Sequence, residues 1–220
     1  MKLLLTSSGL SNKSIAKALF ELVGKPAHKT TITFIPTAMN VGTGDKGWFI
    51  NDLYNIKKQG CKMIDIVDIS ALPKSVWLPR IEAADVLFFS GGNTSHLMYC
   101  LKKSGLAQLL PKLLKTRVYA GISAGSIVTN PTLALSNKDK KLYYEKTFGY
   151  KSEDALGFVD LYVRPHFNSN DFPNVRTKNL KEIARDIKKP IYGLDDVSAL
   201  KIIDGQVKVV TEGKYRKLNG

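Results

Sequence analysis

The residues Gly121-Ile122-Ser123-Ala124-Gly125 form a Gly-x-Ser-x-Gly motif between a predicted buried strand at residues 116–120 and a predicted helix start. A serine at such a strand-to-helix turn projects its hydroxyl from the edge of the sheet. The N–H of Ala124 would then face an oxyanion formed beside that hydroxyl. We therefore predict that Ser123 is a nucleophile. The alternative is an ordinary glycine-rich connection, because short motifs also match by chance.

A serine nucleophile needs a base within hydrogen-bond reach, and the chain has only three histidines. His28 lies in a polar turn, and His96 opens a predicted helix. His166 ends the apolar run 158–163 and enters a polar loop, which is where open α/β sheets place their site residues. We predict that His166 is the base, with a structural capping role as the alternative.

Two adjacent carboxylates follow another short predicted strand at residues 190–192. Side chains of neighbouring residues in an extended segment point in opposite directions, so only one of them is expected to reach the histidine. Asp196 is our first choice for the acid that orients His166, and Asp195 is the second.

Four blocks in this order together resemble the dipeptidase E and cyanophycinase family of serine peptidases. They are Phe-Phe-Ser-Gly-Gly-Asn-Thr at 88–94, Ser-Ala-Gly at 123–125, Pro-His-Phe at 165–167 and Gly-x-Asp-Asp-x-Ser-Ala-Leu at 193–200. The resemblance implies that Ser123 is the nucleophile and His166 the base. The family usually carries glutamate at the third position, where this chain has the shorter Asp196.

A glycine pair after a strand lets a carbonyl oxygen approach a backbone N–H closely. In the resembled family this segment supplies an oxyanion donor, so we expect Gly92 to act together with Ala124, with Gly91 as the next choice. A phosphate-binding turn or a plain strand–helix corner is the alternative.

The resemblance also points to substrate-binding residues. Dipeptidase E holds a substrate carboxylate with an arginine in a Gly-Glu-Thr-Arg block, and this chain has Arg176 after Pro-Asn-Val. We expect Arg176 and Asn93 to bind substrate; a surface helix position is the alternative for Arg176. Three further candidates for lining the pocket are Tyr162, Asn168 and Ser169.

Composition and net charge limit the classes of protein to which the chain can belong. The 220 residues contain 33 Lys and Arg against 19 Asp and Glu, a net charge of +14. No recognisable nucleic-acid module accompanies this charge, so we interpret it as solvated helix faces and as a field that favours acidic substrates. No apolar run is long enough for a membrane span. The start of the chain predicts a strand and not a signal peptide, and Cys61 and Cys100 lack metal spacing, which favours a cytoplasmic location.

Strand and helix signals alternate along the chain and predict an α/β fold, with a mainly parallel sheet covered on both faces. Strands are expected at 3–6, 31–36, 63–69, 86–89 and 116–120, and helices at 14–23, 48–58, 96–103, 106–114 and 175–187. A basic loop is expected from residue 137, and Asp204-Gly205 predicts a hairpin turn. The resemblance implies a single peptidase domain over 1–220, a three-layer α/β/α sandwich related to class I glutamine amidotransferases.

We therefore expect a serine-type peptidase that hydrolyses small peptides, aspartyl dipeptides among them, without metal or organic cofactor, as a monomer or homodimer. Glutamine-amide transfer would need a cysteine at the elbow, where this chain has Ser123. A catalytically impaired family member that acts as a binding protein is the remaining alternative.

Overall fold

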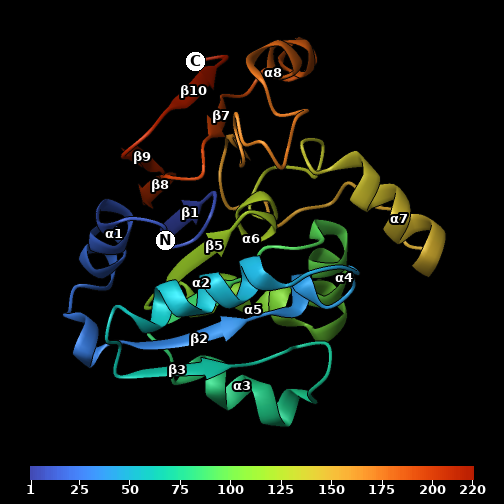
Figure 1. The fold of residues 1–220 in the computed structure, drawn as a ribbon. Coiled ribbons are helices and arrows are strands. Elements are labelled where there is room, and N and C mark those ends of the chain that lie inside the picture. The colour runs from blue at the N-terminus through green and yellow to red at the C-terminus, as the bar shows by residue number, and fades with distance from the viewer.

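A seven-stranded sheet runs through the molecule in the computed structural model, which describes residues 1–220 (Figure 1). The strand order is β3-β2-β4-β5-β1-β8-β9. The strands are β1 (Lys2–Thr6), β2 (Thr31–Ile35), β3 (Met63–Ile66), β4 (Val86–Phe89), β5 (Val118–Ile122), β8 (Ser198–Ile203) and β9 (Gln206–Thr211). The first five are parallel, whereas β8 and β9 add antiparallel strands at one edge.

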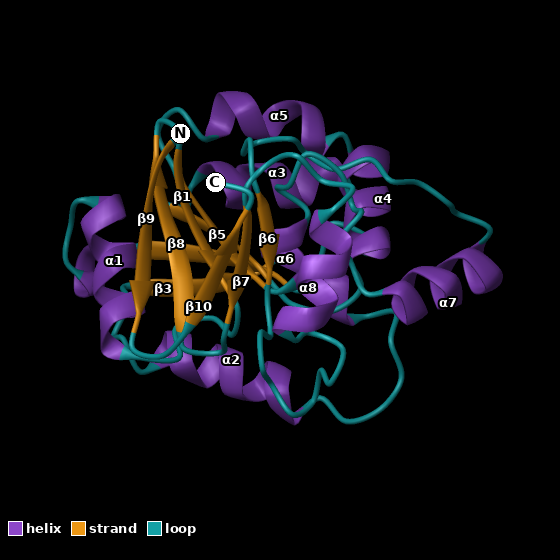
Figure 2. Ribbon diagram, turned by 90° about the horizontal axis from the view of Figure 1, so that it is seen from above, coloured by secondary structure: helices purple, strands orange, loops and turns teal.

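The two faces of this sheet bury alternate side chains. Leu4 and Phe88 pack in the cluster that contains helices α1 and α2, whereas Leu3, Leu5 and Phe89 pack in the cluster of α3, α4 and α5. Figure 2 shows these two groups of helices on opposite sides of the strands. The helices are α1 (Lys13–Val23), α2 (Gly47–Lys57), α3 (Lys74–Glu82), α4 (Thr94–Ser104) and α5 (Leu106–Leu113). The predicted sandwich with a mainly parallel sheet is confirmed.

A second sheet of three strands, in the order β10-β7-β6, lies beside the first. Its strands are β6 (Tyr162–Arg164), β7 (Ile191–Leu194) and β10 (Tyr215–Leu218), and β6 is parallel to β7. The remaining helices are α6 (Ala124–Ile127), α7 (Lys138–Phe148) and α8 (Thr177–Ala184), with 3-10 turns η1 (Ala27–Lys29) and η2 (Thr37–Met39). None of the helices, the longest of which have eleven residues, has the length and hydropathy to span a membrane.

The largest departure from the predicted elements is α7, where a basic loop was expected. Asn137 accepts a hydrogen bond from the N–H of Lys140 as the N-cap, and Gly149 ends the helix in the left-handed conformation. Tyr144 is the one buried residue of this helix, so its sequence lacks the apolar periodicity by which helices are recognised. Helix α7 projects from the body of the molecule (Figure 1).

Three smaller differences concern strand ends and missed elements. The expected strand at 63–69 ends at Ile66, although Val67 and Ile69 remain buried beyond it. The apolar run 158–163 becomes a strand only at Tyr162. Helix α3 and strand β10 were not predicted, because α3 is short and contains Pro79, which disfavours a helix interior, and β10 has only four residues, two of them charged.

Candidate active site

Ser123 occupies a strained backbone position between β5 and α6, with φ 46° and ψ −100°. The flanking glycines are required by packing. A Cβ on Gly121 would lie 2.5 Å from the carbonyl carbon of Gly125, and a Cβ on Gly125 would lie 2.4 Å from the carbonyl oxygen of Phe89. A non-glycine residue at positive φ is energetically costly and is concentrated at functional sites. The motif thus holds the serine hydroxyl at the carboxyl edge of the sheet.

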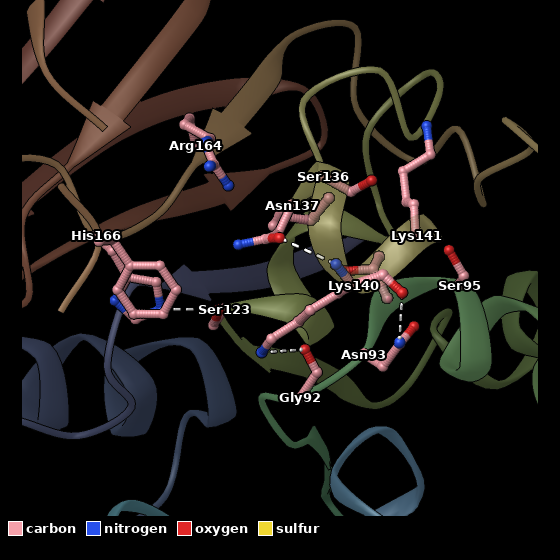
Figure 3. A pocket seen from close by; sticks show the side chains of 13 residues that line it. Gly92, Asn93, Ser95, Ser123, Ser136, Asn137, Lys140, Lys141, Arg164 and His166 are labelled. Atoms are coloured by element: carbon pink, nitrogen blue, oxygen red, sulfur yellow. Dashed lines mark hydrogen bonds between the residues drawn. The ribbon is translucent and has the colours of Figure 1, made fainter. Parts of the chain in front are cut away.

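His166 brings an imidazole to that hydroxyl. Its Nε2 lies 2.9 Å from Ser123 Oγ, as Figure 3 shows. The residue follows β6 with φ 64°, and its ring stacks on Phe172 at a centroid distance of 4.0 Å and an interplanar angle of 5°. The aromatic stack and the strained backbone together fix the direction of the ring.

Asp196 lies on the other side of the imidazole, with Oδ1 2.7 Å from His166 Nδ1. The same oxygen accepts hydrogen bonds from the hydroxyls of Ser7 and Ser8, each at 2.8 Å. Burial acts to raise the pKa of Asp196, but the hydrogen bonds from His166, Ser7 and Ser8 outweigh it and hold the pKa well below 3.8. Asp196 is therefore ionised at neutral pH.

Ser7 links the segment after β1 to the segments that carry His166 and Asp196. Its hydroxyl donates to Asp196 and accepts a 2.8 Å hydrogen bond from the N–H of His166, and the residue is fully buried. Sequence reasoning did not select Ser7 or Ser8. The available signal was the polar pair directly after β1, at the carboxyl edge where parallel sheets place their sites.

Asp195 serves the turn between β7 and β8. Its carboxylate accepts hydrogen bonds from Ser198 Oγ at 2.5 Å and from the N–H of Val197 at 3.2 Å, and also from the N–H of Lys214. The structure therefore brings Asp196, and not Asp195, to His166.

The other two histidines lie elsewhere. His28 is exposed in the η1 turn. His96 lies in the first turn of α4 with Nδ1 3.0 Å from the hydroxyl of Tyr144, and burial lowers its pKa. Neither lines a cavity that contains Ser123.

Three backbone N–H groups beside Ser123 donate to no carbonyl of the chain: those of Gly91, Gly92 and Ala124. Gly92 adopts φ 138°, and a Cβ there would lie 2.1 Å from the carbonyl oxygen of Ala38, so only glycine fits. Gly91, our second choice, lines the same cavity as Gly92 and Ser123.

On one side of Ser123 lies a small pocket that we call the cationic pocket. It contains Arg164, Lys140 and Lys141, and no carboxylate lines it (Figure 3). Lys141 is ion-paired with Glu153, whereas Arg164 makes no hydrogen bond or ion pair within the chain. Burial lowers the pKa of Arg164 to about 10, so it remains charged at neutral pH. An unpaired, largely buried guanidinium is a strong site for an anion.

A second, larger cavity of about 900 Å³ shares Ser123 and His166 with the cationic pocket and has Asp196 in its wall as well. Lys46 and Lys140 line it, as do the hydroxyls that follow β1. Lys140 reaches the site from helix α7, and its Nζ donates to the carbonyl of Gly92 at 3.0 Å (Figure 3). Helix α7, which was not predicted, thus contributes directly to both compartments of the site, the cationic pocket and the larger cavity.

The predicted substrate residues Arg176 and Asn93 are engaged within the chain. The guanidinium of Arg176 donates to the carbonyls of Ser169, Phe172 and Val175 and does not line either compartment. Its three bonds hold the loop that carries Phe172 against His166. The Asn93 side chain caps α4 and donates to the carbonyl of Lys140 at 3.0 Å. Asn93 also lines both the cationic pocket and the larger cavity, so its role in substrate binding stays a prediction, as does that of Arg176. Arg164 is the guanidinium that lines the pocket together with Ser123.

Of the three further lining candidates, only Ser169 reaches the larger cavity. Tyr162 is buried with its hydroxyl 2.9 Å from Thr132 Oγ1, and Asn168 is exposed. Cys61 and Cys100 lie outside both compartments, so no thiol is near the elbow.

The chain is similar in sequence to known peptidases. The model of the family described as Peptidase family S51 matches residues 3–210. An uncharacterized peptidase of Listeria monocytogenes is 28% identical over 174 residues, which is 78% of this chain and 82% of the relative. Peptidase E of Streptomyces coelicolor is 25% identical over 180 residues, covering 79% of this chain and 72% of the relative.

Solved structures share the fold. A crystal structure of a protein from Listeria monocytogenes, provisionally named Peptidase E, superposes with a TM-score of 0.79 at 24% identity and covers 96% of this chain and 98% of its own. A peptidase from an acI-B1 actinobacterium gives a TM-score of 0.71 at 20% identity, covering 99% and 93%.

Proposed function

The chain belongs to peptidase family S51 and is a serine-type peptidase, and on that premise we propose that Ser123, His166 and Asp196 form its catalytic triad. Ser123 Oγ attacks the peptide carbonyl while His166 Nε2 takes the hydroxyl proton. His166 then gives this proton to the leaving amine, and water hydrolyses the acyl-enzyme by the same route. The ionised Asp196 orients the imidazole and stabilises its protonated form.

The single observation that carries the proposal is the continuous hydrogen-bonded chain from Ser123 Oγ through His166 to Asp196, at 2.9 and 2.7 Å. The shorter acid still reaches Nδ1, which favours an active peptidase over a catalytically impaired binding protein. The free N–H groups of Gly92 and Ala124 are the proposed donors to the oxyanion that forms on the substrate carbonyl.

We further propose that the substrates are small peptides with an N-terminal aspartate. Arg164 would bind the aspartate carboxylate through its planar fork, with Lys140 as a second cation on the same wall. The support is the unpaired guanidinium in a pocket without carboxylates, directly beside Ser123. The net charge of +14 would also attract acidic peptides.

The catalytic assignment is tested with Ser123→Ala on Asp-Leu. Removing a triad member commonly lowers the rate by about 10⁴-fold or more. Unchanged circular dichroism and melting temperature would show that the fold is intact. A purified Ser123→Ala protein that cleaves Asp-Leu as fast as the parent would rule out Ser123 as the nucleophile.

The substrate assignment is tested with Asp-Leu and its neutral isostere Asn-Leu. A charge-assisted bond contributes about 1.5–3 kcal/mol, so Arg164→Met should lower kcat/KM on Asp-Leu by about 10- to 100-fold more than on Asn-Leu. Arg176→Met is the matched control and should leave the Asp-to-Asn preference unchanged. Equal rates of the parent on the two dipeptides would contradict the proposal.

A further inference from the structure

Helix α2 turns two polar side chains toward the interior, at positions where a helix of this kind would carry apolar ones. Asp52 and Asn55 are buried with exposures of 7% and 8%, whereas Phe49 and Leu53, which the spacing predicts to face inward, are only partly buried. Asp52 lines the 900 Å³ cavity. Its carboxyl makes no hydrogen bond and no ion pair within the chain, which is unusual for a buried acid.

Asp52 lines the same cavity as the reacting serine. Gly9, in a tight turn with φ 64°, lies between Asp52 and Ile122, the residue that precedes the nucleophile. A Cβ on Gly9 would lie 3.4 Å from Asp52 Oδ1 and 3.1 Å from Ile122 Cδ1. The absence of a side chain at Gly9 therefore leaves the carboxyl in contact with the space beside the elbow.

The surroundings of Asp52 are polar and incompletely bonded. Ser11 lines the same cavity, and its buried hydroxyl has no hydrogen-bond partner. Lys46 and Lys140 line the cavity as well, yet neither forms an ion pair with Asp52. In a protein of net charge +14 with lysines in the same cavity, this carboxyl is left free. Burial alone raises its pKa to about 7, and an arriving cation would favour the ionised form.

We propose that Asp52, with the hydroxyl of Ser11, binds a positively charged nitrogen group of the peptide substrate. This inference rests on the proposed function and adds a second specificity site to it. The cationic pocket would hold the acidic group of the peptide, and Asp52 would hold a cationic group in the larger cavity. That group is either the free α-amino group or the side chain of a lysine or arginine.

The test compares the parent with Asp52→Asn on three peptides: Asp-Lys, Asp-norleucine, which lacks the side-chain charge, and N-acetyl-Asp-Lys, which lacks the α-amino charge. If Asp52 binds the side chain, Asp52→Asn should reduce the preference for Asp-Lys over Asp-norleucine at least tenfold. If it binds the α-amino group, Asp52→Asn should instead reduce the preference for free over acetylated Asp-Lys at least tenfold. If both preference ratios of Asp52→Asn equal those of the parent, the proposal is overturned.

Asp139→Asn is the matched control, because Asp139 is an exposed carboxylate that lines the same cavity. It removes the same charge and should leave both ratios unchanged. An equal reduction in Asp139→Asn and Asp52→Asn would show only a general field effect and would overturn the specific site.

Binding separates this inference from the proposed function. Calorimetric titration of Asp-Lys, Asp-norleucine and N-acetyl-Asp-Lys into Ser123→Ala and into Ser123→Ala/Asp52→Asn needs no turnover. We expect Asp52→Asn to weaken binding at least tenfold for the peptides that carry the recognised charge. If Asp52→Asn selectively weakens peptide binding but the parent hydrolyses none of the peptides, the peptidase proposal is rejected and the Asp52 site is kept. Equal affinities, or no binding to Ser123→Ala, would overturn the site.

Discussion

Two regions of the chain meet at Ser123 and hold their residues by different means. The parallel sheet supplies the nucleophile, whose position depends on backbone packing at Gly121 and Gly125, with no room for a Cβ at either. The small sheet and its connections supply His166 and Asp196, whose positions depend on side-chain hydrogen bonds. The position of Ser123 is therefore sensitive to atoms added at Gly121 and Gly125, whereas the positions of His166 and Asp196 are sensitive to the loss of hydrogen bonds.

This difference explains how the site is assembled. The five segments that deliver the triad, the serines that bond Asp196 and the oxyanion donors follow the carboxyl ends of parallel strands: β1, β4 and β5 in the main sheet, and β6 and β7 in the small one. Ser7 spans the two regions, because its hydroxyl bonds both the N–H of His166 and the carboxylate of Asp196. This buried hydroxyl is thus one of the links between the two regions, beside the bond from Ser8 to Asp196 and that between Ser123 and His166.

The largest expected effect separates the two neighbouring acids of the second region. Asp196→Asn keeps the shape but cannot stabilise a protonated His166, so kcat should fall by about 10⁴-fold. Asp195→Asn should change kcat only a few-fold, because Asp195 bonds the turn and not the imidazole. Steady-state kinetics on Asp-Leu measures both. A large loss at 195 with none at 196 would reverse the assignment.

Asp52 is the exception in the first region, because it is a buried polar group without a partner. Its raised pKa leads us to predict that the stability of the protein depends on pH. Because its pKa is raised from 3.8 to about 7, the folded state keeps a proton that the unfolded chain releases between those pH values. The stability of the parent should therefore fall across this window. Asp52→Asn does not titrate there and should be more stable than the parent by up to about 4 kcal/mol above pH 7.

Urea unfolding of both proteins at pH 4 to 8 measures this difference. Other charged groups line the same cavity and are present in both proteins: Lys46, Asp139, Lys140, His166, Asp171 and Asp196. Their contribution cancels in the comparison to first order. A stability difference that stays constant with pH would contradict the raised pKa of Asp52.

Backbone packing in the first region is tested by Gly125→Ala. The added Cβ would lie 2.4 Å from the carbonyl oxygen of Phe89, so the elbow must shift, and stability should fall by about 3 kcal/mol. Gly42→Ala is the control, since the nearest atom to a Cβ there is Lys46 Nζ at 3.8 Å. Thermal unfolding of both variants measures the effect. Equal melting temperatures would show that the elbow is not held by close packing.

The smallest expected effect concerns the link between the regions. Ser7→Ala removes one donor from Asp196 and leaves the N–H of His166 without its acceptor, so kcat should fall about tenfold. Ser8→Ala removes a donor from Asp196 only and should have a weaker effect. Rates of the two variants on Asp-Leu, with KM measured separately, test this order. A larger loss in Ser8→Ala would reject Ser7 as the coupling residue.

Local patterns predicted the first region well, since the Gly-x-Ser-x-Gly motif and short apolar strands act over a few residues. His166 and Asp196 were also identified, because few histidines compete and each residue follows a recognisable strand. Asp196 could be ranked above Asp195 from the family blocks, but the reason became visible only in the turn that Asp195 bonds.

Residues brought in from distant segments were not predictable. Ser7 meets Asp196 across 189 residues of chain, and Lys140 comes from a helix whose sequence has no apolar face. Arg164 lies two residues before His166 and Arg176 ten residues after it, and only the fold determines which guanidinium faces the pocket. Asp52 appears in sequence as an ordinary polar position of a surface helix.

The most direct test of the central claim is covalent labelling with a serine-directed fluorophosphonate, followed by peptide mapping in a mass spectrometer. We predict one label per chain, located on Ser123, with loss of Asp-Leu hydrolysis in proportion to labelling. His166→Ala should label at least a hundredfold more slowly, because the hydroxyl then has no base. Loss of activity with the label on another residue, or full labelling of Ser123 with activity retained, would contradict the account.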